Sequence, residues 1–170
     1  MELFLIDADV IIWCAEQNKL DTLFKNKEIK MPKKIFEEIN YKVDLVTTEE
    51  SGIDLSKYIE NGSLKIIDSA LSETIRKLRK TYKICPQLAE IQDGEIECIA
   101  LLLENSKYKF CTGDITAMKV VGFLQLSKQA ISLEELIGSL TELRDDFTKE
   151  CLKNNLKVGS KLYVQYGNWS

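Results

Sequence analysis

Short apolar runs bounded by polar residues recur along the chain and predict buried strands. Such runs cover residues 2–6, 64–67 and 108–112, and a shorter one at 129–131 predicts an edge strand. Continuous apolar segments of this length are typical of strands that are buried on both faces of a sheet.

Amphipathic segments between these runs predict helices. Asp9 is a suitable N-cap for the first helix, Pro32 suits a helix start, and Ser132 with Glu135 matches the capping-box pattern. Residues 42–62 are acidic and largely irregular. Helices are expected over residues 10–19, 33–41, 68–82, 95–105, 133–140 and 141–154, after Asp114, and briefly from about residue 55, while residues 162–166 suit a strand or a docked tail.

Alternation of strands and helices predicts an α/β fold with a mainly parallel central sheet flanked by helices on both faces, an α/β/α sandwich. In such sheets ligands bind outside the carboxyl ends of the strands. Asp7 follows the first predicted strand and Asp114 follows the run at 108–112. Both acids are therefore expected at the functional edge.

Composition limits the class of protein. The chain has 170 residues, 45% of them hydrophobic, which suits one globular domain. No apolar run approaches the roughly 18–20 residues that span a bilayer. The start of the chain lacks a basic segment, so no signal peptide is expected. These features predict a cytoplasmic protein without a membrane partner.

Histidine is absent, and this removes histidine-based catalysis and makes a structural zinc site improbable. The cysteines are odd in number and widely spaced, as expected for reduced thiols in a reducing compartment. They are Cys14, Cys85, Cys98, Cys111 and Cys151. A hydrolase built on this chain must therefore use carboxylates and a metal.

The net charge of −4 argues against a passive nucleic-acid binder, because phosphate neutralisation supplies most of the affinity of such proteins. It argues less against a nuclease, whose acidic pocket attracts cations that in turn bind phosphate. A run of lysines is interpreted as a solvated helix and loop surface. It comprises Lys25, Lys27, Lys30, Lys33 and Lys34.

Four widely separated acids carry the candidate chemistry: Asp7, Glu38, Glu95 and Asp114. Converging carboxylates repel one another and need a divalent cation to stay ionised together. Oxygen ligands suit Mg²⁺ or Mn²⁺, which indicates a metal-dependent phosphodiesterase.

Each acid also has a purely structural interpretation. Asp7 and Asp114 can cap helices, and Glu95 can be a favourable first-turn charge. Glu38 competes with the adjacent Glu37, and the register set by Pro32 and Ile35 favours Glu38.

Four segments together resemble the motifs of PIN-domain nucleases. A first strand ends at an aspartate, a helix after proline carries a glutamate, a later helix opens with Gly-Glu-x-Glu, and a Thr-x-Asp motif closes a strand. The segments are residues 5–12 (LIDADVII), 31–39 (MPKKIFEEI), 93–100 (DGEIECIA) and 110–117 (FCTGDITA), and residues 131–137 (ISLEELI) resemble the closing segment of the family.

The resemblance spans roughly residues 2–140 and implies a PIN-like nuclease domain over 1–140, with residues 141–170 as a C-terminal helix and tail packed on the same domain. It implies a metal-dependent endoribonuclease that hydrolyses RNA phosphodiester bonds, of the kind found as toxins in toxin–antitoxin pairs. RNA substrate, an antitoxin protein and a homodimer are the partners implied. An apolar tail is either a dimer interface or packed on its own domain: Leu162, Tyr163, Val164, Tyr166 and Trp169.

The resemblance also assigns roles. Asp7, Glu95 and Asp114 are expected to be the central ligands of Mg²⁺ or Mn²⁺. Glu38 is the fourth catalytic acid, which binds a second cation or orients water. Thr112 is expected to hydrogen-bond Asp7 or a metal-bound water.

The sequence departs from the family pattern at three places. Asp9 stands where asparagine, serine or threonine is usual, and is interpreted as a helix cap, while Glu97 is a supporting acid. Gly113 replaces a frequent acid before Asp114. The basic residues that often follow this motif are missing before Lys119.

Two other functions stay open. The first is a non-catalytic PIN-like interaction protein whose acidic site is unfilled or binds a partner. The second is a phosphatase or phosphotransferase with Asp7 as nucleophile, since Asp7 and Asp9 fit the Asp-x-Asp of haloacid-dehalogenase-like enzymes.

Overall fold

The computed structural model describes residues 3–46, 53–68, 71–82, 85–138 and 142–167. Within them lies a four-stranded parallel sheet in the order β3-β2-β1-β4. The strands are β1 (Leu3–Ile6), β2 (Glu28–Pro32), β3 (Leu64–Ile67) and β4 (Tyr108–Cys111). The predicted α/β class with a mainly parallel sheet is confirmed, and it is consistent with the PIN-like domain that the sequence resembles.

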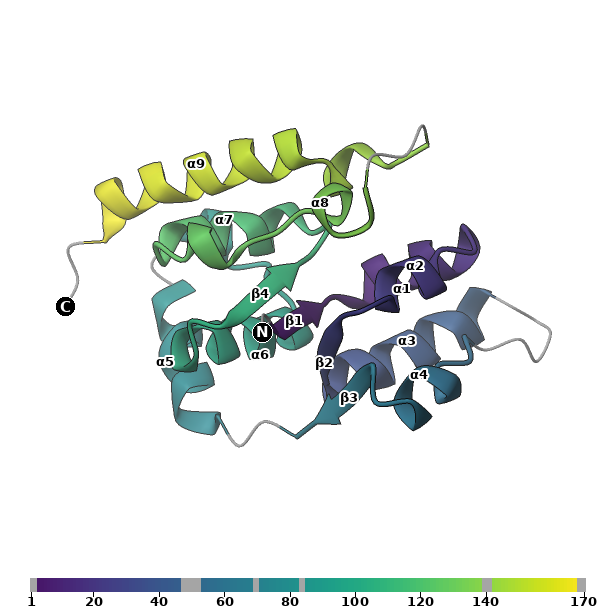
Figure 1. Cartoon of the computed structure of the whole chain (residues 1–170). Helices are drawn as coiled ribbons and strands as arrows, with labels where there is room; N and C mark the ends of the chain where they lie inside the picture. The colour runs from purple at the N-terminus through teal and green to yellow at the C-terminus, as the bar shows by residue number, and fades with distance from the viewer. Residues whose placement is uncertain (1–2, 47–52, 69–70, 83–84, 139–141, 168–170) are drawn as a thin grey trace.

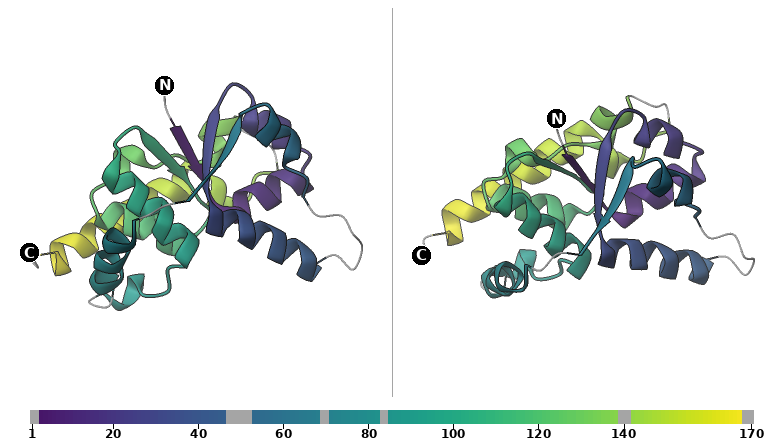
Figure 2. Two further views of the ribbon diagram at one scale, coloured as in Figure 1. Left: turned by 90° about the horizontal axis from the view of Figure 1, so that it is seen from below. Right: turned by 60° about the horizontal axis from the view of Figure 1, so that its bottom comes forward.

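Helices cover both faces of this sheet, as predicted. Figure 1 shows α7 and α9 above β4, α5 to the left of the sheet, and α3 and α4 to its right. The two views in Figure 2 show the strands side by side between these layers. The helices are α1 (Ala8–Glu16), α2 (Leu20–Phe24), α3 (Lys33–Val46), α4 (Ser56–Glu60), α5 (Ser72–Tyr82), α6 (Asp93–Glu104), α7 (Ile115–Phe123), α8 (Leu133–Ile137) and α9 (Lys149–Tyr166), with short 3-10 turns η1 (Pro86–Leu88), η2 (Ser127–Gln129) and η3 (Asp145–Phe147).

The strand β2 corrects the interpretation of the lysine run as a solvated helix and loop surface. Ile29 and Met31 alternate with Glu28 and Lys30 and are fully buried, so β2 has a period-two pattern that its charge obscures. Lys30 lies over the ring of Tyr108, 5.6 Å from its centroid, and Glu28 pairs with Lys65 of β3 at 2.9 Å. These cross-strand contacts allow charged residues to remain in a central strand.

The C-terminal region also differs from the sequence prediction. The helix expected over 141–154 and the strand or tail expected at 162–166 are one helix, α9, which begins at Lys149. Thr148 caps it, since its hydroxyl accepts a hydrogen bond from the Cys151 amide. The edge strand expected at 129–131 is a single bridge between Ala130 and Phe110. Trp169 lies outside the described residues.

Two glycines let α9 pack closely on α7. A side chain at Gly159 would collide with the backbone carbonyl of Lys119, and one at Gly122 would collide with the backbone of Leu156. The backbones of the two helices are therefore in contact at their crossing. Leu162 is buried on the same side of α9, whereas Val164 is 81% exposed.

None of the described helices combines the length and apolar character that a membrane span requires. All five cysteines are free thiols.

The helix crossing predicts that Gly159→Ala destabilises the protein by about 1–3 kcal/mol, because overpacking forces the two backbones apart. In a helix without such a contact, glycine to alanine adds up to about 1 kcal/mol of stability, so the sign of the effect is diagnostic. Urea denaturation measures it. Asn154→Ala, on the exposed side of the same helix, is the matched control and should stay within about 0.5 kcal/mol of wild type.

Candidate active site

The carboxylate of Asp7 stands at the carboxyl end of β1, where the chain turns into α1. It caps this helix: its Oδ1 accepts a hydrogen bond of 2.7 Å from the amide of Ala8. The N-cap is therefore Asp7, and the sequence assignment of this role to Asp9 is wrong. The reason is that α1 begins at Ala8, which places Asp9 in its first turn.

Thr112 joins the ends of β1 and β4 through its hydroxyl. The Oγ1 atom donates a hydrogen bond of 3.0 Å to Oδ2 of Asp7, as predicted, and accepts one of 3.0 Å from the amide of Asp114. The amide of Asp7 donates to the carbonyl of Cys111 at 3.1 Å. Asp7 and Asp114 are thus held at the same edge of the sheet.

Asp114 caps α7 with one of its two carboxylate oxygens. Its Oδ1 accepts a hydrogen bond of 2.7 Å from the amide of Ala117. Within the described ranges, Oδ2 has no hydrogen-bonding partner. Capping therefore leaves an oxygen of Asp114 available for another ligand.

Glu95 enters the same region from the first turn of α6. Its Oε2 accepts a hydrogen bond of 3.0 Å from the amide of Gln92, which completes a capping box. The residue is only 3% exposed, yet its Oε1 has no partner among the residues that the structure describes. Burying a carboxylate oxygen without a hydrogen bond costs free energy, and this makes Oε1 a candidate ligand atom for a cation.

Glu38 reaches the site because α3 and α6 pack closely. Gly94 has no side chain where Ile35 of α3 lies, and a Cβ at Gly94 would stand 3.5 Å from Oε2 of Glu38. Glu37, by contrast, points to solvent and pairs with Lys33 at 3.8 Å. Of the two adjacent glutamates, Glu38 is the one beside the other acids.

The four acids influence one another electrostatically. Burial is the main cause that raises the pKa of Glu95 to about 9, and the charges of Asp7, Asp114 and Glu38 add to it. Burial and the charge of Asp9 raise the pKa of Asp7 to about 7, although its hydrogen bonds from Thr112 and Ala8 oppose the shift. Acidic side chains from four parts of the fold thus lie close enough to influence one another electrostatically.

Positive compensation for these buried acids comes from helix ends. Asp7, Glu95 and Asp114 each accept a backbone hydrogen bond at the start of a helix, where the dipole is positive. No lysine or arginine in the described part of the chain forms an ion pair with Asp7 or Glu95. The helix ends stabilise the charged carboxylates only in part, and the pKa values of Asp7 and Glu95 therefore remain raised.

The chemistry of these residues fits a hard divalent cation, because all the donors are oxygens and two carboxylates carry an oxygen without a partner. Their arrangement is not already closed around one point. In the described ranges, no group of three or more acidic, cysteine or histidine side chains is close enough to hold a metal ion.

Two basic side chains at the edge of the site were not identified from the sequence. Lys34 lies 3.2 Å from Asp93 and 3.9 Å from Glu97, beside an open cavity of about 430 Å³ that Glu38 and Gly94 also line. Lys34 was assigned to the solvated lysine run, and only the packing of α3 on α6 reveals its position. Glu97, a supporting acid in the sequence, is its partner.

Arg144 is the second basic side chain, and it comes from the C-terminal segment. It forms a two-point ion pair with Asp146 and stacks on Phe147, 4.6 Å from its ring centroid. The ring of Phe147 occupies the space that a side chain at position 113 would need. A Cβ atom at this position would also lie 3.1 Å from Oδ2 of Asp146. Gly113 is therefore a glycine for steric reasons.

No protein-family model and no curated protein matches this chain. Among solved structures, it is similar to VapBC2 from Rickettsia felis, which was crystallised with a DNA fragment from its promoter. Identity is 19%, the match covers 66% of this chain and 89% of the other, and the TM-score is 0.47.

The raised pKa values predict that metal-free protein loses stability as the pH rises. The folded-state values of about 7 for Asp7 and about 9 for Glu95 exceed their ordinary values of 3.8 and 4.5. The folded state therefore binds these protons more tightly, and the stability that they contribute is complete below the ordinary values and lost as the pH rises to the folded-state values.

Denaturant unfolding in EDTA, between about pH 5 and pH 9, measures this dependence. In Glu95→Gln, the fall in stability above about pH 7 should flatten by up to about 1 kcal/mol per pH unit. Asp93→Asn, at an exposed acid of the same helix, should behave as wild type. Parallel curves for wild type and Glu95→Gln would contradict the assignment.

Proposed function

We propose that this protein is a metal-dependent endoribonuclease that hydrolyses RNA phosphodiester bonds. The observation that supports the proposal is that Asp7, Glu38, Glu95 and Asp114 lie near one another at the carboxyl edge of the sheet. Asp7 and Glu95 are buried and, in the described part of the chain, form no ion pair with a lysine or arginine. Proteins keep such groups ionised by binding a cation.

Asp7, Glu95 and Asp114 are the residues that would hold Mg²⁺ or Mn²⁺, and Glu38 would hold a second cation or orient water. The bound cation would supply Lewis-acid stabilisation of phosphate charge and a more acidic water. Thr112 fixes the orientation of Asp7 through its hydrogen bond. Desolvation of Glu95 sets its raised pKa and favours its exchange of a proton for a cation.

In the proposed reaction, a water oxygen forms a bond to phosphorus and the ester P–O bond to the leaving ribose oxygen breaks. The water proton passes to solvent or to a carboxylate, and the leaving ribose oxygen takes up a proton from solvent to become a hydroxyl. Glu38, half-buried at the rim, is suited to orient that water. Lys34 and Arg144 would bind non-bridging phosphate oxygens. A guanidinium held by Asp146 presents its remaining donors in a fixed geometry, which suits phosphate.

The biological setting follows the family resemblance of the sequence. We place the activity in the cytoplasm, with RNA as substrate, and keep a toxin role with an antitoxin partner as a prediction. Tyr163 is 44% exposed and Val164 is 81% exposed on the outer side of α9, so a homodimer through this helix also stays a prediction.

A second candidate is a non-catalytic PIN-like interaction protein. Two observations favour it: the described acids do not form a closed metal-binding group, and Glu95 is engaged in a capping box. The phosphatase alternative has less support, because both oxygens of its nucleophile Asp7 accept hydrogen bonds and the residue is buried.

The ribonuclease proposal predicts metal-dependent cleavage of a mixed RNA pool. Wild type should cut with Mn²⁺ or Mg²⁺ and not with EDTA, and Asp114→Asn should lose about 100-fold or more of this activity, since even groups that support ligands are worth 10–100-fold. Electrophoresis of the labelled pool gives the rates.

Glu38 and Glu37 offer a matched pair for the same assay. Glu38→Gln should slow cleavage strongly, whereas Glu37→Gln, one residue away and exposed, should cleave as wild type. Equal activity of Asp114→Asn and wild type would show that the acids are not the site.

Metal binding separates the two candidate functions. Under the ribonuclease proposal, Mn²⁺ at a hundred times its dissociation constant stabilises the folded protein by about 2.7 kcal/mol, a shift of several degrees in Tm. Asp114→Asn should lose most of this shift in a thermal melt, and Glu37→Gln should retain it. Absence of any shift in wild type would favour the interaction protein.

A further inference from the structure

The outer side of α9 carries a row of lysines that the proposed chemistry does not use. They recur at every fourth position, which places them along one side of the helix with about 6 Å between successive residues. The row comprises Lys149, Lys153, Lys157 and Lys161, and Glu150 is the single acid in this helix. A chain with a net charge of −4 thus concentrates positive charge on one element.

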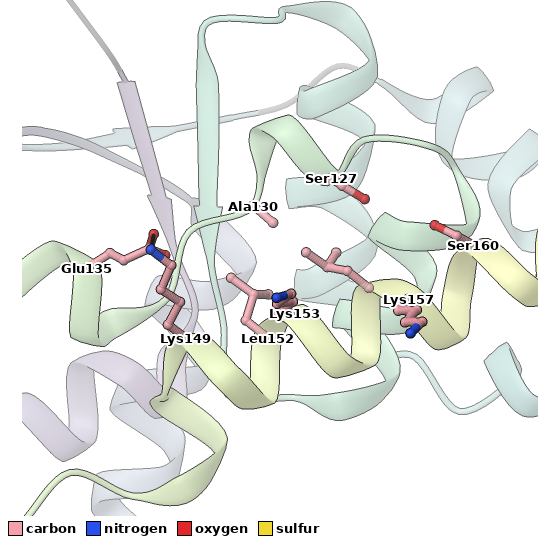
Figure 3. A pocket seen from close by; sticks show the side chains of 9 residues that line it. Ser127, Ala130, Glu135, Lys149, Leu152, Lys153, Lys157 and Ser160 are labelled. Carbon is pink, nitrogen blue, oxygen red and sulfur yellow. Dashed lines mark ion pairs between the residues drawn. The ribbon is translucent and has the colours of Figure 1, made fainter.

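An open groove of about 370 Å³ runs beside this row, between α9 and the segment from η2 to α8. Figure 3 shows Lys149, Lys153 and Lys157 along the helix side of the groove. Leu152 and Leu156 of α9 contribute its apolar floor, together with small and hydroxyl-bearing residues from both sides. The groove therefore combines an aliphatic base with a basic edge.

Among the described residues, the lysines at the centre of this row have no ion-pair partner. Lys149 pairs with Glu135 at 3.3 Å. Across the described ranges, no carboxylate lies within ion-pair distance of Lys153 or Lys157. Like charges four residues apart repel one another and destabilise a helix. An anion in the groove would remove that cost.

The groove starts close to the acidic site. Phe147, two residues before Lys149, has its ring against Gly113, which directly precedes Asp114. At the same end, the amide of Lys149 donates to Glu134 of α8 at 2.8 Å. A polymer bound at Asp114 thus has the groove within reach along α9.

We propose that the groove beside α9 binds the sugar-phosphate backbone of an RNA strand at nucleotides outside the cleaved bond. Lys153 and Lys157 neutralise successive phosphates, and the aliphatic floor contacts the ribose and base. The nature of the ligand rests on the proposed ribonuclease function. A regular row of point charges suits a polymer with one charge per nucleotide.

The test is RNA binding without cleavage. Fluorescence anisotropy of a labelled single-stranded RNA is measured in EDTA over a range of salt concentrations. Neutralising two phosphate contacts lowers the slope of log affinity against log salt by about 1.4, because each contact contributes about 0.7 for a single strand. The double variant Lys153→Gln/Lys157→Gln should show this loss, and Lys153→Arg/Lys157→Arg should bind as wild type.

The matched control is Lys25→Gln/Lys80→Gln, which removes the same charge at exposed positions on other elements. It should bind RNA as wild type. Unchanged affinity and salt slope in the groove variant, or no RNA binding by wild type, would overturn the proposal. Displacement of RNA by polyglutamate at lower concentration than by unlabelled RNA would also overturn it, in favour of an acidic protein ligand.

Asp114→Asn distinguishes this inference from the proposed function. In EDTA it should bind RNA as wild type, although it does not cleave. Lysine-dependent binding by a wild-type protein that cuts no RNA with any metal would leave the groove assignment standing and reject the nuclease.

Discussion

The hydrogen bonding of one buried carboxylate, that of Asp7, organises this protein. One oxygen caps α1 through Ala8, and the other accepts the hydroxyl of Thr112, which also receives the amide of Asp114. Two adjacent parallel strands and two helix starts are therefore joined around a single side chain. The central strands must end at the same level for this to occur, so the register of the sheet and the geometry of the acidic site are the same constraint.

The burial of neighbouring acids at the edge of the sheet destabilises the folded state electrostatically. Glu95 is buried beside three other acids, and its pKa is raised to about 9. The helix ends that face the acids reduce the cost without removing it. A fold selected for stability alone would place neutral or apolar residues here. Ionisable groups at such a position therefore support the proposed cation-binding role.

The sequence predicted the parallel sheet and the acids at its carboxyl edge, because both depend on local patterns: apolar runs that end at aspartate, and helix starts that follow them. It did not predict β2, since Lys30 and its neighbours obscure a period-two pattern that only pairing with β1 and β3 reveals. Residues 162–166 are apolar enough to suggest a strand, but the crossing at Gly159 continues α9 through them. Tertiary packing brings Lys34 and Arg144 to the edge of the site, and no local sequence pattern predicts their positions. The division of the chain at residue 140 stays a prediction.

The contact between Phe147 and Gly113 links two parts of the sequence that a motif search treats as unrelated. As long as the ring lies against the backbone before Asp114, an acid cannot occupy position 113. The number of carboxylates in the last motif is thus decided by the C-terminal segment. Among relatives of this chain, an acid at position 113 should accompany a small residue, or none, at position 147. The two positions are coupled sterically, so a residue of the C-terminal segment limits which side chain can precede Asp114.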